Sequence, residues 1–255
     1  MIINRRTPDT PHPSNLSLNP RMFFDFADRN NTTFSNSDVQ GVKGKSSASV
    51  NMMQTIATSQ PADGGTDLFF DDPVNEQFMD AGADFILSDS SRSGLTMMFL
   101  VKHPETTTQK FVYDIGGFAG TGYGMDYTGT RIGCYTPINH GGAQTEKNPV
   151  DAPTSGWVVI IAVIKFGDSQ KVYINKNLEA QTAIPGLSEL SAATITETAT
   201  RGPASGPSVI GTTSKTPAGT RIWKGNFKNG LIYDEALSDY QRNILYIYQR
   251  NKISV

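Results

Sequence analysis

Hydrophobic and polar positions alternate in short segments along most of the chain, a pattern that predicts many strands. β-Branched and aromatic residues make up these segments, and clusters of Gly, Pro, Asn, Asp and Ser separate them. Because helical segments do not alternate with the strands, the pattern argues against βαβ units and favours an all-β, antiparallel sandwich of the jelly-roll kind. The predicted strands cover residues 22–26, 67–70, 84–87, 95–102, 110–115, 122–127, 131–135, 156–166, 171–174, 208–211 and 226–234.

The segment WVVIIAVIKF at residues 157–166 is apolar on both faces of a strand. It therefore predicts a central strand that is covered on both sides, which requires at least two layers. The residues that follow predict a hairpin with its turn at 167–169. Alternation along the second strand places Val172 and Ile174 on the face opposite Tyr173.

A single helix is predicted near the C-terminus. Ser238 can cap it, and Gln241 three residues later can complete a capping box. The apolar positions near one face of this helix are Leu237, Ile244 and Tyr248, with Tyr240 and Ile247 beside them. Between residues 188 and 220, a composition of Thr, Ala, Ser, Gly and Pro predicts long loops with one short strand at 208–211.

Residues 1–20 contain four prolines and few apolar side chains, so they predict an extended arm ahead of a single domain at residues 21–255. The arm is either a disordered tail or a segment docked on a neighbouring subunit. The sequence contains no apolar run of the length that a signal peptide or a transmembrane helix requires. We therefore expect a chain made in the cytoplasm, without membrane insertion, that is soluble or incorporated into a virion or surface assembly.

Charge and cysteine content narrow the function classes. The 22 Lys and Arg residues nearly balance 24 Asp and Glu residues, giving a formal net charge of -2, so no global field attracts nucleic acid. A single cysteine, Cys134, excludes an internal disulfide and any site that needs two thiolates from one chain.

The C-terminal sequence IWKGNFKNGLIYDEALSDYQRNILYIYQRNKI resembles the end of concanavalin A-like lectin/glucanase domains of the laminin G-like type. The most specific match is Asp234-Glu235-Ala236-Leu237-Ser238 between a strand and the closing helix. FFDFADRNNTTF, GLTMMFLVKHP and WVVIIAVIKFGDSQKVYINKNLEA fit the same family in the expected order, although Lys176 replaces the commoner Gly. The resemblance implies a jelly-roll sandwich with a short C-terminal helix, a fold that serves lectins, hydrolases, adhesion modules and viral surface proteins.

Catalytic motifs are missing from the sequence. Glucanases of this fold carry an E-x-D-x-x-E strand motif that places their carboxylates on one face, and that spacing does not occur here. His12, His103 and His140 share no metal-binding spacing, and no GxSxG elbow or phosphate loop is present. We therefore expect a non-enzymatic protein, with a polysaccharide hydrolase or lyase as the least favoured alternative.

A glycine-rich segment at residues 116–124 precedes the candidate ligand-binding residues Tyr123, Asp126, Tyr127 and Tyr135. Glycine lets a backbone approach a ligand closely, and aromatic faces can stack on sugar rings. Alternation puts Tyr123 and Tyr127 on one face and Asp126 on the other. Ordinary sandwich core is the competing interpretation of the same aromatic residues.

Two acidic loops offer oxygen ligands for calcium, an ion that commonly accompanies the family. One candidate site consists of Asp71, Asp72, Asn75 and Glu76, and the other consists of Asp25, Asp28 and Asn30. Solvated turn residues are the alternative interpretation of both loops, and no cofactor is required by the sequence.

Besides the disfavoured hydrolase or lyase, two functions remain open from the sequence. The first is a non-catalytic, lectin-like module that binds a glycan or a protein surface and is displayed on a larger assembly. The second is a structural virion or appendage protein, such as a capsid decoration, fibre or tail component. In the second hypothesis residues 1–20 anchor the protein to virion neighbours or to further copies of itself.

Overall fold

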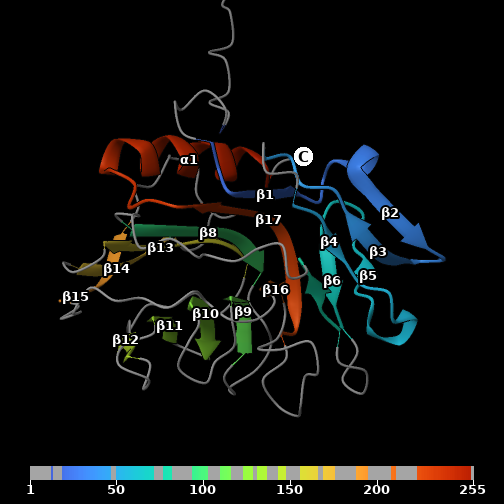
Figure 1. Ribbon diagram of the computed structural model, residues 1–255, viewed down its shortest axis with the longest axis horizontal. Helices are drawn as coiled ribbons and strands as arrows, with labels where there is room; N and C mark the ends of the chain where they lie inside the picture. Colours follow the sequence, from blue (N-terminus) through green and yellow to red (C-terminus); the bar gives the residue numbers. More distant parts are fainter. Residues whose placement is uncertain are drawn as a thin grey trace, which may run out of the picture.

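The structure is a computed structural model in which strands form two stacked sheets and one helix packs on the outside (Figure 1). The layers follow the order helix, first sheet, second sheet. The structure describes residues 13, 19–46, 50–71, 77–81, 94–102, 110–115, 123–128, 131–136, 143–147, 156–165, 169–175, 188–194, 208–210 and 223–253.

The first sheet lies beneath the helix and contains the longest strands. Its neighbours pair antiparallel throughout, and β8 and β13 lie at its centre. In spatial order its strands are β1 (Met22–Asp25), β17 (Gly225–Tyr233), β8 (Gly94–Lys102), β13 (Trp157–Lys165), β14 (Ser169–Asn175) and β15 (Ser188–Thr194).

The second sheet faces the first and continues through shorter strands. In spatial order it contains β12 (Ala143–Lys147), β11 (Arg131–Thr136), β10 (Tyr123–Thr128), β9 (Lys110–Ile115), β16 (Ser208–Ile210), β7 (Met79–Asp80), β4 (Met52–Met53), β3 (Asp38–Val42) and β2 (Thr32–Ser35). Two strands, β5 (Ala62–Asp63) and β6 (Leu68–Phe70), connect β3 to β17 by hydrogen bonding and so join the two sheets along one edge. Two short 3-10 helices, η2 (Arg29–Asn31) and η3 (Ala57–Ser59), lie in the loops near this edge.

Strand β13 shows why the sequence produces layers on both sides of the first sheet. Its side chains alternate between the core that separates the two sheets and a second cluster under the helix. Ile160 lies in the first core, whereas Val159 and Ile161 lie in the second. The predicted central strand, covered on both faces, is confirmed.

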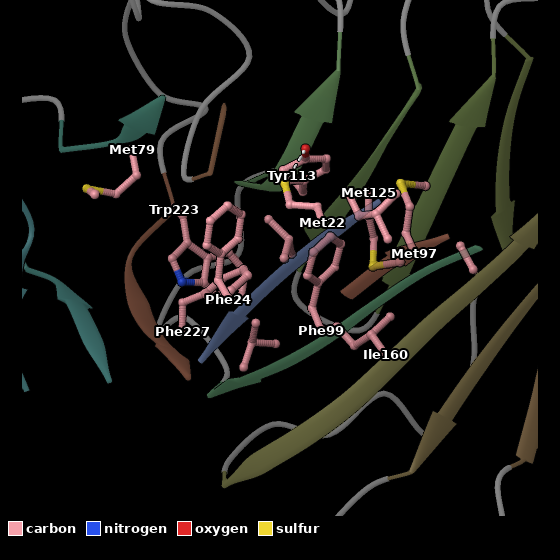
Figure 2. Packing of buried hydrophobic residues seen from close by; sticks show 14 of the residues in the cluster. Met22, Phe24, Met79, Met97, Phe99, Tyr113, Met125, Ile160, Trp223 and Phe227 are labelled. Atoms are coloured by element: carbon pink, nitrogen blue, oxygen red, sulfur yellow. Dashed lines mark hydrogen bonds between the residues drawn. The ribbon is translucent and has the colours of Figure 1, made fainter. Parts of the chain in front are cut away.

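The core between the sheets is rich in aromatic rings. Figure 2 shows Phe99 of the first sheet beside Tyr113 of the second, and their ring centroids lie 5.1 Å apart. Phe227 also packs on Phe99, with ring centroids 5.4 Å apart. Edge-to-face and tilted aromatic pairs of this kind add to the free energy gained by burying the rings.

The helix α1 (Asp239–Asn251) begins where the sequence predicts. Ser238 accepts a hydrogen bond from the Gln241 backbone N–H, and the Gln241 side chain accepts one from the Ser238 backbone N–H, so the capping box is present. The predicted apolar face was wrong in part, because Tyr240 is 74% exposed. The side chains that α1 buries are Arg242, Leu245, Tyr246, Tyr248 and Gln249.

The polar members of this buried face explain the error. Arg242 donates to the Leu237 carbonyl oxygen and to the Asp239 carboxylate, and its guanidinium lies 4.1 Å from the centroid of the Tyr173 ring. Gln249 donates to Asn229 Oδ1 over 2.7 Å. A hydrophobic-pattern argument assigns Arg and Gln to the solvent face, although here Arg242 packs on Tyr173 and Gln249 donates to Asn229, both beneath this helix.

The long loop predicted from residue 188 onward was wrong over residues 188–194, because β15 occupies Ser188–Thr194 and pairs with β14, whereas residues 195–207 lie outside the described residues. Its sequence, SELSAAT, has little strand propensity, so the hydrogen bonds of the neighbouring strand decide its conformation. The short strands β2, β3, β4, β5, β7 and β12 were not predicted either. The strand predicted at 84–87 lies outside the described residues.

In the described part of the chain, no helix has the length and apolar character that crossing a membrane requires.

Candidate functional site

The four predicted ligand-binding residues lie on the adjacent strands β10 and β11. Backbone pairing places Tyr135 opposite Gly124 and Tyr127 opposite Ile132. Met125 and Ile132 are buried in the core between the sheets. The strands therefore bring Tyr123, Asp126, Tyr127 and Tyr135 into one neighbourhood, and their role in binding stays a prediction.

The first predicted calcium loop is described only at Asp71. Gln77 Nε2 donates to Asp71 Oδ1 over 3.2 Å, and the Asp71 backbone N–H donates to Gln77 Oε1 over 2.7 Å. Asp72, Asn75 and Glu76 lie outside the described residues, as do the three histidines. Calcium binding at this loop stays a prediction.

The second predicted calcium loop holds lysine side chains against its carboxylates. Lys45 Nζ lies 2.6 Å from Asp28 Oδ2 and 3.3 Å from Asp25 Oδ2. Lys252 Nζ lies 2.6 Å from Asp25 Oδ2 as well, and the hydrogen bond from Lys45 lowers the pKa of Asp28. A cation at this loop would have to displace an ammonium group. Within the described ranges, no group of three or more His, Cys, Asp or Glu side chains is arranged to hold a metal.

A different surface combines aromatic and polar groups on the outer face of the first sheet. Four directly opposed residues follow one another across β13, β8, β17 and β6. They are Trp157, Lys102, Asn226 and Phe69, and we call them the cross-strand row. Directly opposed residues project from the same face of a sheet, so the side chains of the row lie next to one another.

The row lies where β17 changes direction. The pairing of β17 with β8 shifts register between Phe227 and Asn229, so Lys228 is an extra residue in the strand. Figure 1 shows β17 running beneath α1 and then turning toward β6. The part of the strand that contains Asn226 therefore lies past the end of the helix.

Exposure differs along the row in a way that suits ligand contact. Phe69 is 37% exposed although Leu68 and Phe70 on either side of it are buried. Lys102 is exposed and Asn226 is half-buried. Trp157 is 8% exposed and forms the edge of the cluster under the helix.

The Asn226 amide is held by a buried carboxylate. Asn226 Nδ2 donates to Asp67 Oδ1 over 2.6 Å, and Asp67 is 8% exposed. Burial raises the pKa of Asp67, and the opposing effects of Asn226, Lys228 and Lys102 are smaller. Because Asp67 accepts from the NH₂ group, the amide is oriented, and its carbonyl oxygen is directed away from the carboxylate.

Lys228 supports the other side of the row. Its ammonium group lies 5.4 Å from the centroid of the Trp157 ring, within cation–π range. Burial lowers the pKa of Lys228, and the charges of Asp67 and Asp25 oppose that change. The exposed Phe69 and Lys102 and the half-buried Asn226 therefore lie close to two buried groups of opposite charge, Asp67 and Lys228.

Sequence reasoning did not find this site. It predicted the strand at residues 67–70 and the strand at 226–234, but 159 positions separate Asp67 from Asn226. The available signal was the alternation in LFF, where Phe69 is the outward position between two core residues.

Comparison with known proteins bears on the fold. No protein-family model and no curated protein sequence matches the chain. The binding domain of botulinum neurotoxin serotype G is similar with a TM-score of 0.59 and 12% identity, covering 91% of this chain and 51% of that one. A botulinum neurotoxin type C structure is similar with a TM-score of 0.57 and 12% identity, covering 93% and 53%. A GH54 α-L-arabinofuranosidase is similar with a TM-score of 0.56 and 9% identity, covering 85% and 51%.

The chain spans about half the length of these three structures. At such low identities the similarity concerns the fold. It agrees with the layers described above, and the protein is an all-β jelly-roll sandwich with a short C-terminal helix.

Proposed function

We propose that this protein is a non-catalytic recognition module that binds carbohydrate through the cross-strand row. The observation that carries the proposal is the exposed Phe69 ring next to Asn226, whose amide is oriented by the buried Asp67. A sugar ring presents C–H groups on its faces and hydroxyl groups at its edges. An aromatic face can pack against the C–H groups, and an oriented amide with a nearby ammonium group can form hydrogen bonds with the hydroxyl groups.

The comparisons support a binding role at the level of the fold. Two of the three structures described above are botulinum neurotoxins, one of them a binding domain. The type C toxin depends on interaction with two ganglioside molecules to get into cells. The similar arabinofuranosidase is a catalytic protein. The fold alone therefore does not separate binding from hydrolysis. Membership of the concanavalin A-like, laminin G-like group is part of the proposal.

A glycan array tests the proposal with three proteins: the full-length chain, Phe69→Ala and Tyr240→Ala. Tyr240 is a matched control because it is an exposed aromatic residue on α1, outside the row. We expect saturable binding by the full-length chain and by Tyr240→Ala, with loss of binding by Phe69→Ala. Binding that survives Phe69→Ala would move the site elsewhere, and an array without any binding would refute the carbohydrate function.

The second hypothesis, a virion or appendage component anchored by residues 1–20, stays a prediction. Of the arm, the structure describes Pro13 and residues 19–20. Deleting residues 1–18 tests it, since an anchoring arm predicts loss of assembly with the fold retained.

A further inference from the structure

The cross-strand row does not stop at Phe69. Ala62 of β5 lies directly opposite Phe69, Asp38 of β3 lies opposite Ala62, and Ser35 of β2 lies opposite Asp38. Seven consecutive strands thus contribute one residue each. At about 4.8 Å between neighbouring strands, the extended row is about 29 Å long.

The extended row has a mixed chemistry along its length. Phe69 and Ala62 are apolar and lie at its centre, with Asn226 and Lys102 on one side and Asp38 and Ser35 on the other. Each of these six residues is half-buried or exposed. Hydrogen-bonding groups therefore flank an apolar centre on both sides, so a ligand that covers Phe69 reaches polar side chains in both directions.

Among the described residues, the charges of the extended row and of the groups buried directly beneath it balance. Lys102 and Lys228 are matched by Asp38 and Asp67, and the nearby Arg29 and Asp63 form an ion pair with each other, in which Arg29 Nη2 donates to Asp63 Oδ2 over 2.6 Å. A polyanion such as nucleic acid or an acidic polysaccharide gains little from a row whose own charges balance.

The direction of the row excludes one common mode of peptide binding. The row crosses the strands, and β8, β17, β6 and β5 each have a paired strand on both sides, with Asp38 of β3 opposite Ala62 of β5. Addition of a peptide strand needs an unpaired sheet edge. A ligand on the row is therefore held by side chains. To contact the whole row, it must present similar hydrogen-bonding and apolar groups repeatedly along its length.

We propose that the extended row binds an internal stretch of a linear, neutral polysaccharide, and not the terminal sugar of a branched or acidic glycan. This inference rests on the proposed carbohydrate function and specifies its ligand class. A linear polysaccharide presents the same hydroxyl and C–H groups at every unit, and it needs no net charge on the protein. Contacts on both sides of Phe69 predict that affinity rises with chain length.

Calorimetry with the full-length chain tests this proposal. The probes are β-1,4-, β-1,3- and α-1,4-linked glucose oligomers from dimer to hexamer, the corresponding mannose and xylose oligomers, and α2,3-sialyllactose as the acidic arm. We expect a neutral hexamer to bind at least about tenfold more tightly than its dimer, a difference of about 1.4 kcal/mol.

Variants at the Ser35 end of the extended row separate this effect from folding. Asp38→Ala and Ser35→Ala lie outside the four-residue row that carries the proposed carbohydrate site, and each should weaken hexamer binding while leaving dimer binding at Phe69 unchanged. Lys43→Ala is the matched control, because Lys43 is exposed and lies beside β3 but outside the row. Loss of dimer and hexamer binding together would contradict an extended site.

The remaining outcomes are distinguishable. Affinity independent of length, or a preference for sialyllactose over every neutral oligomer, would overturn the polysaccharide inference and leave the carbohydrate function standing. Absence of binding to all of these probes and to the glycan array would overturn both.

Discussion

Lys252, just past the end of α1, donates to the buried carboxylate of Asp25 in β1 over 2.6 Å, across 227 positions of sequence. The Lys252 ammonium also lies 5.3 Å from the centroid of the Tyr248 ring, which packs edge-on against Phe23 of the same strand. The two ends of the described fold are therefore joined by one charged hydrogen bond over an aromatic pair.

Replacing Lys252 by methionine tests the contribution of this contact to stability. Asp25 is 2% exposed, so loss of one of its two lysine partners leaves a buried carboxylate poorly compensated. We expect Lys252→Met to lower the free energy of unfolding by about 1.5–3 kcal/mol. Urea denaturation measures it, with Lys43→Met as the control at an exposed lysine, expected within about 0.5 kcal/mol of the parent. Equal stability of the two variants would contradict this account.

The capping box of α1 gives a second prediction. Ser238→Ala removes the hydroxyl that accepts the Gln241 backbone N–H and should cost about 1 kcal/mol. Ser238→Asp keeps an acceptor at the same place and should retain most of the stability. If both substitutions have the same effect on thermal unfolding, the cap does not stabilise the helix.

Gly94 at the start of β8 gives a third prediction. A Cβ at this position would lie 2.3 Å from the Ile164 carbonyl oxygen and 2.8 Å from the Ala236 Cβ, so a neighbouring strand or the segment before α1 would have to move. We expect Gly94→Ala to destabilise the protein by about 1–3 kcal/mol, the usual cost of overpacking. Ile56→Ala, at a side chain that is 55% exposed, is the control. A Gly94→Ala protein as stable as the parent would contradict this prediction and show that the neighbouring residues move without loss of stability.

Asp67 gives a prediction about pH. Burial raises its pKa in the folded protein above 3.8, so the folded state binds a proton more readily than the unfolded state. The corresponding stability is fully present below pH 3.8 and is lost as the pH rises through the raised pKa. Asp67→Asn keeps an acceptor for Asn226 but cannot ionise. We therefore expect the parent to lose stability relative to Asp67→Asn as the pH rises, in denaturation measured from acidic to neutral pH. A constant difference would contradict the raised pKa.

Much of the fold follows from local sequence pattern. The apolar run at β13 specifies a strand buried on both faces, and Ser238 with Gln241 specifies the start of α1. β15 could not be predicted, because its residues have weak strand propensity and its conformation depends on pairing with β14. The buried face of α1 was misjudged for a similar reason, since Arg242 packs on the Tyr173 ring and Gln249 donates to Asn229, and both are tertiary contacts.

The candidate site was less predictable than the fold. Phe69 and Asn226 meet because β6 pairs with the first residues of β17, and strand pairing over such a distance leaves no local trace in the sequence. The residues that sequence did single out, Tyr123, Asp126, Tyr127 and Tyr135, came from one continuous segment and its neighbouring strand. A search for aromatic residues that cluster in the sequence finds sites on one segment or on adjacent strands. It misses sites whose residues come from strands that are distant in the sequence and meet only in the fold.

Mapping the bound ligand by NMR chemical shifts tests the central claim most directly. The full-length protein, labelled with ¹⁵N, is titrated with the oligosaccharide that binds best in calorimetry, and Phe69→Ala and Tyr240→Ala serve as variant and control. The account predicts that the largest shifts fall at Phe69, Asn226 and Lys102 and disappear in Phe69→Ala alone. Shifts concentrated on β10 and β11, around Tyr123, Asp126, Tyr127 and Tyr135, would contradict the cross-strand row and support the site first predicted from the sequence.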